Sequence, residues 1–431
     1  MVATDISTAD PQQGGNGNGV ITAADGTPLK TALARANVRA RRRAFFLVLP
    51  LLAFVVLTFA IPIGQLLYRS IYNAAFSDNM PQLTAWFAAN PQATGVPGES
   101  GFEALALDLI EARKDRTIGR VGVRVNYELP GSTSLFKSTA RKAKRFEAPP
   151  YREKLLEING KWDNPVLWDV MRRASNPYTI TFYLAALDLA FSPDGEVAQV
   201  DEKRRIYVPL FMRTLILSAV IGLLCLLLGF PIAHLLATLP LRYSNLLMIF
   251  VLLPFWTSLL VRTTSWIVLL QSQGVVNDVL VALGIIGDDG RIQMMYNQIG
   301  TIVAMTHILL PFMVLPLYSV MKTIPPSYVR AARSLGANPF TAFWRVYFPL
   351  TVPGIGAGSL LVFILAIGYY ITPALVGGAT GQLISNLIAF HMLSSLNWSL
   401  AAALAALLLA GVILLYWLYD RIVGVDKMKL G

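Results

Sequence analysis

The sequence is poor in cysteine, histidine and charge. Its single cysteine, Cys225, excludes an intrachain disulfide and a cysteine-based metal site. The three histidines, His234, His307 and His391, lie far apart without the spacing of metal ligands, so we expect no metal and no cofactor. Charged residues make up 14% of the 431 residues and hydrophobic residues 55%, whereas an average soluble domain has about 25% charged residues. This composition indicates a membrane protein.

The sequence contains several long, almost uncharged apolar segments. A helix that spans a bilayer needs about 20 largely apolar residues. Six segments meet or nearly meet this length, namely residues 44–68, 214–233, 246–270, 299–320, 352–371 and 401–418. The first follows an arginine cluster, as a signal peptide would, but its apolar run is too long and no small-residue cleavage site follows, so we interpret it as an uncleaved anchor. The sequence therefore predicts an all-α polytopic protein with six transmembrane helices.

Lysine and arginine in the short connections predict the orientation of the chain. Basic residues precede the first span and recur in the second connection, in the fourth connection and at the C-terminus, whereas the fifth connection, residues 372–397, has no charge. We therefore expect both termini in the cytoplasm and residues 69–208 in the periplasm. The 19 basic and 17 acidic residues of this long segment nearly cancel, so no nucleic-acid partner is expected.

The segment 69–208 is long enough to form a small domain. Alternation of Val121, Val123 and Val125 with polar residues predicts a strand over residues 120–129, and short helical patterns occur elsewhere. Residues 178–187 fit either a strand or a helix. We therefore predict a small mixed α/β periplasmic insertion between the first two transmembrane helices.

These patterns divide the chain into five parts. The first residues, to about position 30, are rich in Gly, Asn, Gln, Ala and Thr and cannot bury enough apolar area to fold. The predicted parts are a disordered cytoplasmic tail over 1–43, the first transmembrane helix over 44–68, the periplasmic insertion over 69–208, a core with five transmembrane helices over 209–424, and a cytoplasmic tail over 425–431.

The most informative motif lies in the fourth connection, residues 322–350, which reads VRAARSLGANPFTAFWRVYFPLTVPG from position 329. Small side chains at 331 and 332 can lie on one helical face, and Gly336 is predicted to end that helix because it tolerates positive φ. Asn338-Pro339 is predicted to start a second helix, which stops before Pro349. Two short helices on a cytoplasmic loop suit docking in a groove of a soluble partner.

This spacing resembles the EAA loop of ABC-importer permeases, which has Glu-Ala-Ala, three residues, Gly, nine residues, a branched apolar residue, one residue, and an apolar residue before Pro. Every position fits except the first, where Arg330 stands in place of the usual Glu. The residues that the resemblance assigns to coupling with an ATPase are Arg330, Ala331, Ala332, Gly336, Ala337, Phe343, Trp344 and Pro349.

Other segments are similar to those of spermidine/putrescine-type permeases, within the binding-protein-dependent transport system permease family. They are Leu253 to Ser258 with the following Arg262, Thr263 and Trp266, Ile308 to Tyr318, and Gly377-Gly378. The likeness runs from about residue 206 to 424 and includes the first span. The insertion and the N-terminal tail match no family that we can name.

The resemblance implies a permease subunit of the cell inner membrane. Such a subunit lies in the lipid bilayer, pairs with a second permease as a heterodimer, receives solute from a periplasmic solute-binding protein and is driven by two ABC ATPase subunits. The chain has no Gly-x-x-x-x-Gly-Lys-Ser/Thr loop, so it is not expected to bind nucleotide or to be an enzyme itself.

The transported solute stays open at this point. A polyamine is a cation and needs carboxylates to offset its desolvation, but none of the six predicted spans contains Asp or Glu. Either a partner permease supplies the carboxylates, or the solute is an opine, an amino-acid derivative or another small organic molecule. Arg262 either contacts a solute carboxylate or the binding protein, or extends to the outer interface. Tyr369 and Tyr370 either line the path and stack on solute or anchor the chain at the interface.

A stand-alone secondary transporter or a channel is the alternative class. It predicts inverted repeats or ionisable groups within the membrane for ion coupling. Neither is visible in the sequence.

Overall fold

The computed structural model describes residues 29–146, 148–192 and 196–423. The chain divides into two compact units, Met1–Gln65 and Leu66–Gly431, and each is described by itself. The predicted tails therefore lie outside the described residues over 1–28 and over 425–431.

The first unit contains the first span. Helix α1 (Leu29–Val55), the π-helical turn η1 (Val56–Ala60) and helix α2 (Ile61–Ile71) follow one another without a break, and α2 extends into the second unit. Residues Ala40–Ile71 are long and apolar enough to cross a membrane. Because α1 begins at Leu29, the expectation of disorder is wrong for residues 29–43. This stretch is rich in Ala, Leu and Arg, which are strong helix formers.

Two π-helical turns have the same local cause. The turn η1 ends two residues before Pro62, and the turn η5 (Phe343–Tyr347) ends two residues before Pro349. A proline has no N–H for the helical ladder, and its ring presses on the carbonyl four residues earlier. One extra residue in the preceding turn widens the helix and relieves this conflict, so each helix continues through its proline.

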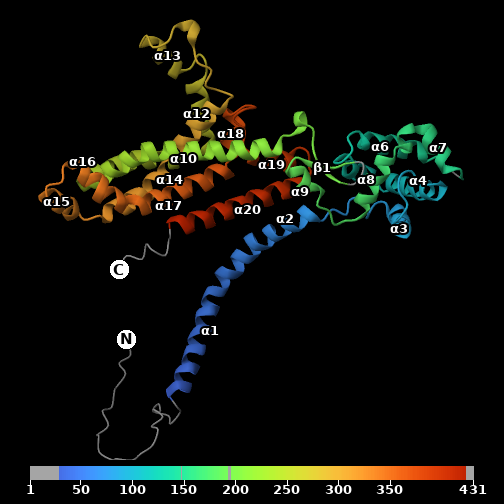
Figure 1. Cartoon of the computed structure of the whole chain (residues 1–431), viewed down its shortest axis with the longest axis horizontal. Helices are drawn as coiled ribbons and strands as arrows, with labels where there is room; N and C mark the ends of the chain where they lie inside the picture. The colour runs from blue at the N-terminus through green and yellow to red at the C-terminus, as the bar shows by residue number, and fades with distance from the viewer. Residues whose placement is uncertain (1–28, 147, 193–195, 424–431) are drawn as a thin grey trace, which may run out of the picture. The chain divides into compact units, whose positions relative to one another are not determined.

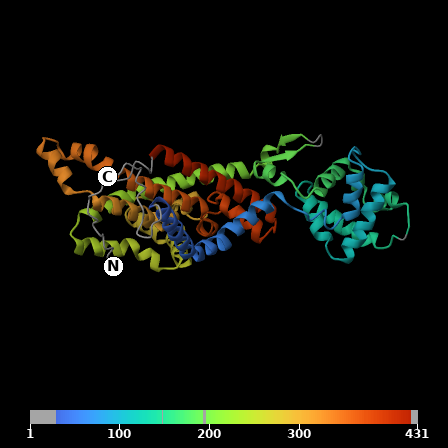
Figure 2. The ribbon, with the colours of Figure 1, turned by 90° about the horizontal axis from the view of Figure 1, so that it is seen from below.

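Four long helices form the core of the second unit. They are α10 (Tyr207–Thr238), α14 (Gln298–Thr323), α17 (Phe348–Gly368) and α20 (Trp398–Val423), and all four run side by side (Figure 1, Figure 2). Glycines allow close packing between three of them. A Cβ on Gly229 of α10 would lie 3.0 Å from the Met313 side chain, and one on Gly358 of α17 would lie 2.8 Å from its sulfur. Met313 of α14 is thus held between two glycine notches, which is a common packing mode of membrane helices.

The third predicted span, residues 246–270, is wrong as a single helix. The structure has α11 (Leu241–Trp256), a break at Thr257 and Ser258, then α12 (Leu259–Leu270) and α13 (Val275–Ala282). Ser258 is extended, and its hydroxyl accepts a hydrogen bond from the Val261 backbone N–H at 3.2 Å, so it caps a new helix. The candidate span in this region is Leu259–Ala282, and α11 is a shorter apolar helix. The other predicted spans each overlap one candidate span.

Short elements connect the core helices. They are the 3₁₀ turn η4 (Asp288–Gly290), α15 (Pro326–Ser334), α16 (Pro339–Ala342), α18 (Ile371–Val376) and α19 (Ile384–Leu393).

The insertion between α2 and α10 is mainly helical. It contains α3 (Pro81–Ala89), α4 (Glu99–Lys114), α5 (Ile118–Asn126), α6 (Ser132–Ala143), α7 (Tyr151–Ile158), η2 (Gly160–Asp163), α8 (Pro165–Ser175), α9 (Thr181–Ala186), β1 (Leu189–Phe191), β2 (Val197–Gln199) and η3 (Glu202–Arg204). Its core is built on Trp162 and Trp168, which are fully buried. The Trp162 indole N–H donates to the Thr139 hydroxyl at 3.0 Å, and that of Trp168 donates to the Trp162 carbonyl at 2.8 Å.

The prediction of a strand over 120–129 is wrong, because this stretch forms helix α5. Val121 and Val125 are both fully buried, and at a spacing of four residues they share one face of the helix. The Arg124 guanidinium pairs with Glu128 at 2.9 Å, which is again a helical spacing. Valines two residues apart fit a strand, but the outer two also fit a helix, and packing decides between them. The described β structure is one antiparallel hairpin, β1 with β2.

The chain enters and leaves the helical part of the insertion at one place, which we call the neck (residues 71–73 and 177–179). Tyr72 and Tyr178 form an antiparallel bridge, and their rings are 5.3 Å apart. The Asn73 N–H donates to the Pro177 carbonyl at 2.7 Å, and the Thr179 N–H donates to the Ile71 carbonyl at 2.8 Å. After the neck, α9 packs on α20 through an apolar cluster that includes Phe182, Ala186, Leu400 and Leu404.

Candidate functional site

The loop over residues 322–350 contains two complementary helix ends. Gly336 has a φ of 89°, the left-handed conformation that glycine adopts without strain. Its N–H donates to the Arg333 carbonyl at 3.0 Å, and the Ala337 N–H donates to the Ala332 carbonyl at 3.1 Å. These two bonds are the Schellman motif that ends α15. The predicted end of the first helix at Gly336 is therefore confirmed.

The second helix starts as predicted but does not stop as predicted. The Asn338 side chain accepts a hydrogen bond from the Thr341 N–H at 2.7 Å and caps α16, with Pro339 in its first turn. The expected stop before Pro349 is wrong, because α16 continues through η5 into α17, and residues Pro339–Gly368 form one candidate membrane span. The π-helical turn accommodates the proline. The loop thus continues without a break into a helix long enough to cross a membrane.

Exposure separates the large apolar residues of this loop into two groups. Leu335 is 89% exposed and Phe340 is 72% exposed, and no residue of α15 is buried. Trp344 is half exposed, and its ring lies 4.7 Å from that of Phe348. Phe343, in contrast, packs as part of the membrane core. Leu335 and Phe340 therefore present the apolar groups most accessible to a partner.

The loop is also basic. Residues 322–350 contain Lys322, Arg330, Arg333 and Arg345 and no acidic residue. All four are exposed, as is Ala331, whereas Ala332 and Ala337 are partly covered. Small side chains beside exposed guanidinium groups leave room for the close approach of a second helix.

The solute-path candidates gather partly around α12. Arg262 lies on α12, and its buried Nε has no hydrogen-bond partner among the described residues. The Thr263 hydroxyl, on the same helix, lies 3.4 Å from the Thr372 hydroxyl of α18. Tyr370 follows Tyr369 in the break between α17 and α18 and is 42% exposed. The structure thus places α12 beside the segment that carries Tyr369 and Tyr370.

The break between α17 and α18 is held by side chains from α19. The Tyr369 carbonyl accepts from the Ser385 hydroxyl at 2.5 Å, and the Tyr370 carbonyl accepts from the Asn386 amide at 2.7 Å. These bonds replace the helical bonds that the break removes, as is needed for irregular backbone in a membrane.

Sequence reasoning missed two histidine contacts. The Trp266 indole N–H donates to His307 Nδ1 at 3.1 Å, across 41 residues of sequence. His234 Nδ1 and the Tyr347 hydroxyl lie 3.1 Å apart, across 113 residues. No local pattern in the sequence marks either pair, because each joins residues of two different helical segments.

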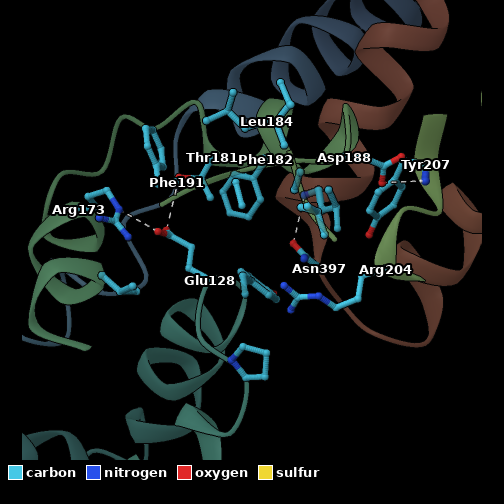
Figure 3. Close-up of a pocket in the computed structure, with 18 of the residues that line it drawn as sticks. Glu128, Arg173, Thr181, Phe182, Leu184, Asp188, Phe191, Arg204, Tyr207 and Asn397 are labelled. Carbon is cyan, nitrogen blue, oxygen red and sulfur yellow. Dashed lines mark hydrogen bonds and ion pairs between the residues drawn. The ribbon is translucent and has the colours of Figure 1, made fainter. Parts of the chain in front are cut away.

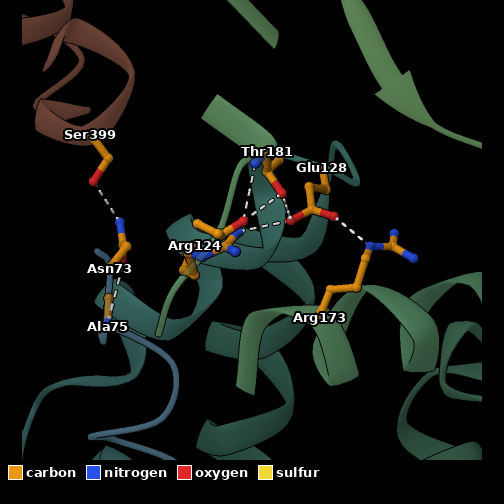
Figure 4. Close-up of polar contacts among 8 residues, drawn as sticks. Asn73, Ala75, Arg124, Glu128, Arg173, Thr181 and Ser399 are labelled. Carbon is orange, nitrogen blue, oxygen red and sulfur yellow. Dashed lines mark hydrogen bonds and ion pairs between the residues drawn. The ribbon is translucent and has the colours of Figure 1, made fainter. Parts of the chain in front are cut away.

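A cavity of about 520 Å³ lies where the insertion meets α10, α19 and α20 (Figure 3). Two of its carboxylates, Asp188 and Glu128, are already paired. Asp188 accepts three backbone N–H groups at the start of α10, from residues 206, 207 and 208. Glu128 accepts from Arg124 at 2.9 Å, Arg173 at 3.1 Å and the Thr181 hydroxyl at 3.4 Å (Figure 4). These bonds join the helical insertion to α9 and to α10.

Comparison with known proteins gives a consistent answer. Residues 226–424 match the family described as binding-protein-dependent transport system inner membrane component. The chain is 38% identical over 216 residues to the spermidine/putrescine transport system permease protein PotB of Haemophilus influenzae. The aligned residues make up 50% of this chain and 75% of that relative. The chain is 36% identical over 241 residues to PotB of Escherichia coli, which covers 54% of this chain and 86% of that relative. A crystal structure of a bacterial ABC transporter involved in alginate import aligns with 52% of this chain and 80% of its own, at 21% identity and a TM-score of 0.42.

These relatives confirm the resemblance inferred from the loop and the spans. They are permease subunits and not enzymes, and members of the family work with an ATPase, a second permease and a periplasmic binding protein. Six helices among the described residues are long and apolar enough to cross a membrane, as expected of a multi-pass inner-membrane protein. The chain therefore belongs to the binding-protein-dependent transport system inner membrane component family and is a permease subunit of an ABC importer.

Proposed function

We propose that this chain forms one half of a transmembrane path for a small organic cation of the polyamine class. It pairs with a second permease, receives solute from a periplasmic binding protein and is driven by ATPases that dock on residues 322–350. The observation that carries the proposal is the two-helix loop. It has the spacing of an ABC-importer coupling loop, an exposed surface and a continuous connection through η5 to α17.

The chemistry of the loop specifies the ATPase surface that receives it. Leu335 and Phe340 are exposed and suit an apolar pocket, whereas Arg330 and Arg333 beside them suit acidic residues at its rim. Opposite charges across an interface mainly set the choice of partner and the association rate. We therefore infer an ATPase groove with an apolar floor and a negative rim. Phe343 holds the loop on the membrane core, and Trp344 packs against Phe348 beside it.

The names of the relatives support a polyamine-type solute, and the path of this chain sets a condition on it. The predicted spans contain Arg262 and no Asp or Glu. A di- or polycation in a low-dielectric path needs carboxylates, so we propose that the second permease supplies them. Tyr369 then contributes an aromatic face to the solute. The Nε of Arg262, which has no hydrogen-bond partner in the described part of the chain, favours a second candidate, a solute with a carboxylate group, such as an amino-acid derivative.

The short connections support the orientation of the chain. Their basic residues favour a cytoplasmic position for both termini and for residues 322–350. The insertion between α2 and α10 then lies in the periplasm, on the side of the binding protein.

Reconstitution in vesicles tests the proposal. The chain, its second permease and the ATPase are placed in vesicles that contain ATP, and the binding protein is added outside with radiolabelled spermidine. We expect uptake that needs both ATP and the ATPase. Uptake driven by an ion gradient without the ATPase would instead establish a secondary transporter. Competition decides the solute class, because excess putrescine should block uptake and an anionic opine should not; the opposite result would establish the carboxylate-bearing solute.

A further inference from the structure

The π-helical turn η5 packs against α10 at His234. The Tyr347 hydroxyl lies 3.1 Å from His234 Nδ1, and the two rings meet edge to face with centroids 5.0 Å apart. Tyr347 is only 8% exposed, so this polar contact lies in an apolar surrounding. Unlike ring packing alone, a hydrogen bond fixes which residues of the two helices face each other.

A second contact lies one helical turn away on α10. The ring of Phe343 meets that of Phe230 edge to face at 6.1 Å and that of His234 at 6.2 Å. The Phe348 ring lies 5.9 Å from Phe230. The contacts on α10 therefore fall at positions 230 and 234, on both sides of Pro231.

Both α10, at Pro231, and the turn η5 depart from regular α-helical hydrogen bonding where they meet. Pro231 has no N–H, so α10 lacks one backbone hydrogen bond there and can bend more readily than a regular helix. The turn η5 has the wider π-helical hydrogen bonding, which is often found at functional sites. The chain runs from α16 through η5 directly into α17, and η5 packs sideways on α10 beside Pro231.

We propose that the His234–Tyr347 hydrogen bond and the Phe230–Phe343 contact form a joint that transmits movement of the loop 322–350 to α10 at Pro231. His234 and Tyr347 are positioning residues, because they touch neither solute nor nucleotide and act by keeping η5 and α10 in register. The proposal rests on the proposed function of the loop as the ATPase docking site. It adds that α10, as well as α17, receives the movement.

Removal of one hydroxyl tests the joint. Tyr347→Phe keeps the ring and deletes only the hydrogen bond, and Tyr318→Phe is the matched control. Tyr318 belongs to the same apolar core, and its hydroxyl makes no hydrogen bond with another described residue. In the reconstituted importer we expect Tyr347→Phe to retain its ATPase subunits on purification and to transport about five- to tenfold less solute per ATP hydrolysed, as the loss of one buried hydrogen bond predicts. Tyr318→Phe should transport as the unchanged protein does.

Changes at His234 separate positioning from packing. His234→Leu should lower the ratio of transport to hydrolysis as Tyr347→Phe does, and His234→Gln, which can still bond to the hydroxyl, should restore much of it. The double variant His234→Leu with Tyr347→Phe should lose no more than either single variant, because both remove the same bond. Unchanged ratios, additive losses, or loss of bound ATPase with an unchanged ratio would each overturn the joint. The proposed function fails separately, if the unchanged protein shows no ATP-driven uptake.

Discussion

Replacement of Gly336 should uncouple the loop in proportion to the strain that each side chain introduces. A Cβ at this position meets no atom within 4 Å, so the cost comes from the backbone conformation at φ 89° and not from a clash. An L-residue in the left-handed region costs about 1–2 kcal/mol, and a β-branched residue costs more, whereas Asn tolerates this region. Opposing this strain are the two hydrogen bonds of the Schellman motif, each worth about 1 kcal/mol net.

In Gly336→Val the backbone strain outweighs the two hydrogen bonds of the Schellman motif, so we expect the turn to open. Because no residue of α15 is buried, little else holds this helix in its orientation. We expect uptake to fall by about tenfold in Gly336→Val, by about threefold in Gly336→Ala and hardly at all in Gly336→Asn, with free-energy differences of about 1.4 and 0.7 kcal/mol for the first two. Uptake and solute-stimulated ATPase activity in reconstituted vesicles measure the series, after equal membrane insertion is verified.

Gly284 provides a matched control. It has a φ of 69°, no atom within 4 Å of a Cβ, and the same pair of hydrogen bonds at the end of α13, from Gly284 N–H to the Val281 carbonyl and from Ile285 N–H to the Leu280 carbonyl. Gly284→Val should therefore suffer the same strain without affecting coupling. Equal uptake by the Asn and Val variants at 336, or an equal defect in Gly284→Val, would refute the reasoning.

Three further predictions concern topology and the insertion. With the native cysteine replaced, an impermeant thiol reagent on intact cells should modify Ser134→Cys on α6 and spare Ser334→Cys on α15; the reverse pattern would invert the topology. Glu128→Ala leaves two arginines without their carboxylate, so it should destabilise the insertion by about 3–5 kcal/mol and speed its limited proteolysis in the intact protein, and unchanged proteolysis would contradict this. Burial raises the pKa of the Asp108 carboxyl to about 6, so the folded state binds the carboxyl proton more tightly than the unfolded state does. Protonation of Asp108 therefore stabilises the fold fully below about pH 4, and this contribution is lost as the pH rises through 6. The insertion should resist protease better at pH 5 than at pH 7.5, and Asp108→Asn should remove that difference; if the difference persists, another group causes it.

The parts that could be predicted from the sequence are those governed by local chemistry. The end of α15 at Gly336 and the start of α16 at Asn338 depend on one left-handed residue and one capping side chain, and both were predicted correctly. The spans followed from the length of apolar runs, except where Ser258 caps a new helix inside one of them. An apolar run with one serine looks the same in sequence whether that serine caps a new helix or lies within a continuous one. Composition alone therefore could not reveal the break.

The parts that could not be predicted depend on packing across long sequence separations. The three alternating valines of α5 fit a strand locally, and only the burial of Val121 and Val125 against the rest of the insertion selects a helix. The joint between His234 and Tyr347 requires α10 and η5 to be placed side by side first. The continuation of the loop into α17 depends on the π-helical turn, and no sequence rule that we applied anticipates an extra residue before Pro349. The spacing of residues 322–350 thus marks candidate coupling residues, whereas their contacts with α10 required the three-dimensional arrangement.

Because the neck brings its two ends together, the helical part of the insertion, residues 74–176, can be added or removed as one piece. Its two ends are already hydrogen-bonded to each other, with the Asn73 N–H 2.7 Å from the Pro177 carbonyl. A chain that lost residues 74–176 would have to bridge only this gap, and a tight turn can do so at little cost in loop entropy. Closely spaced ends of this kind are the usual condition for domain insertion. Gain, loss or exchange of the insertion could therefore occur in one recombination event, leaving the helices on either side in register.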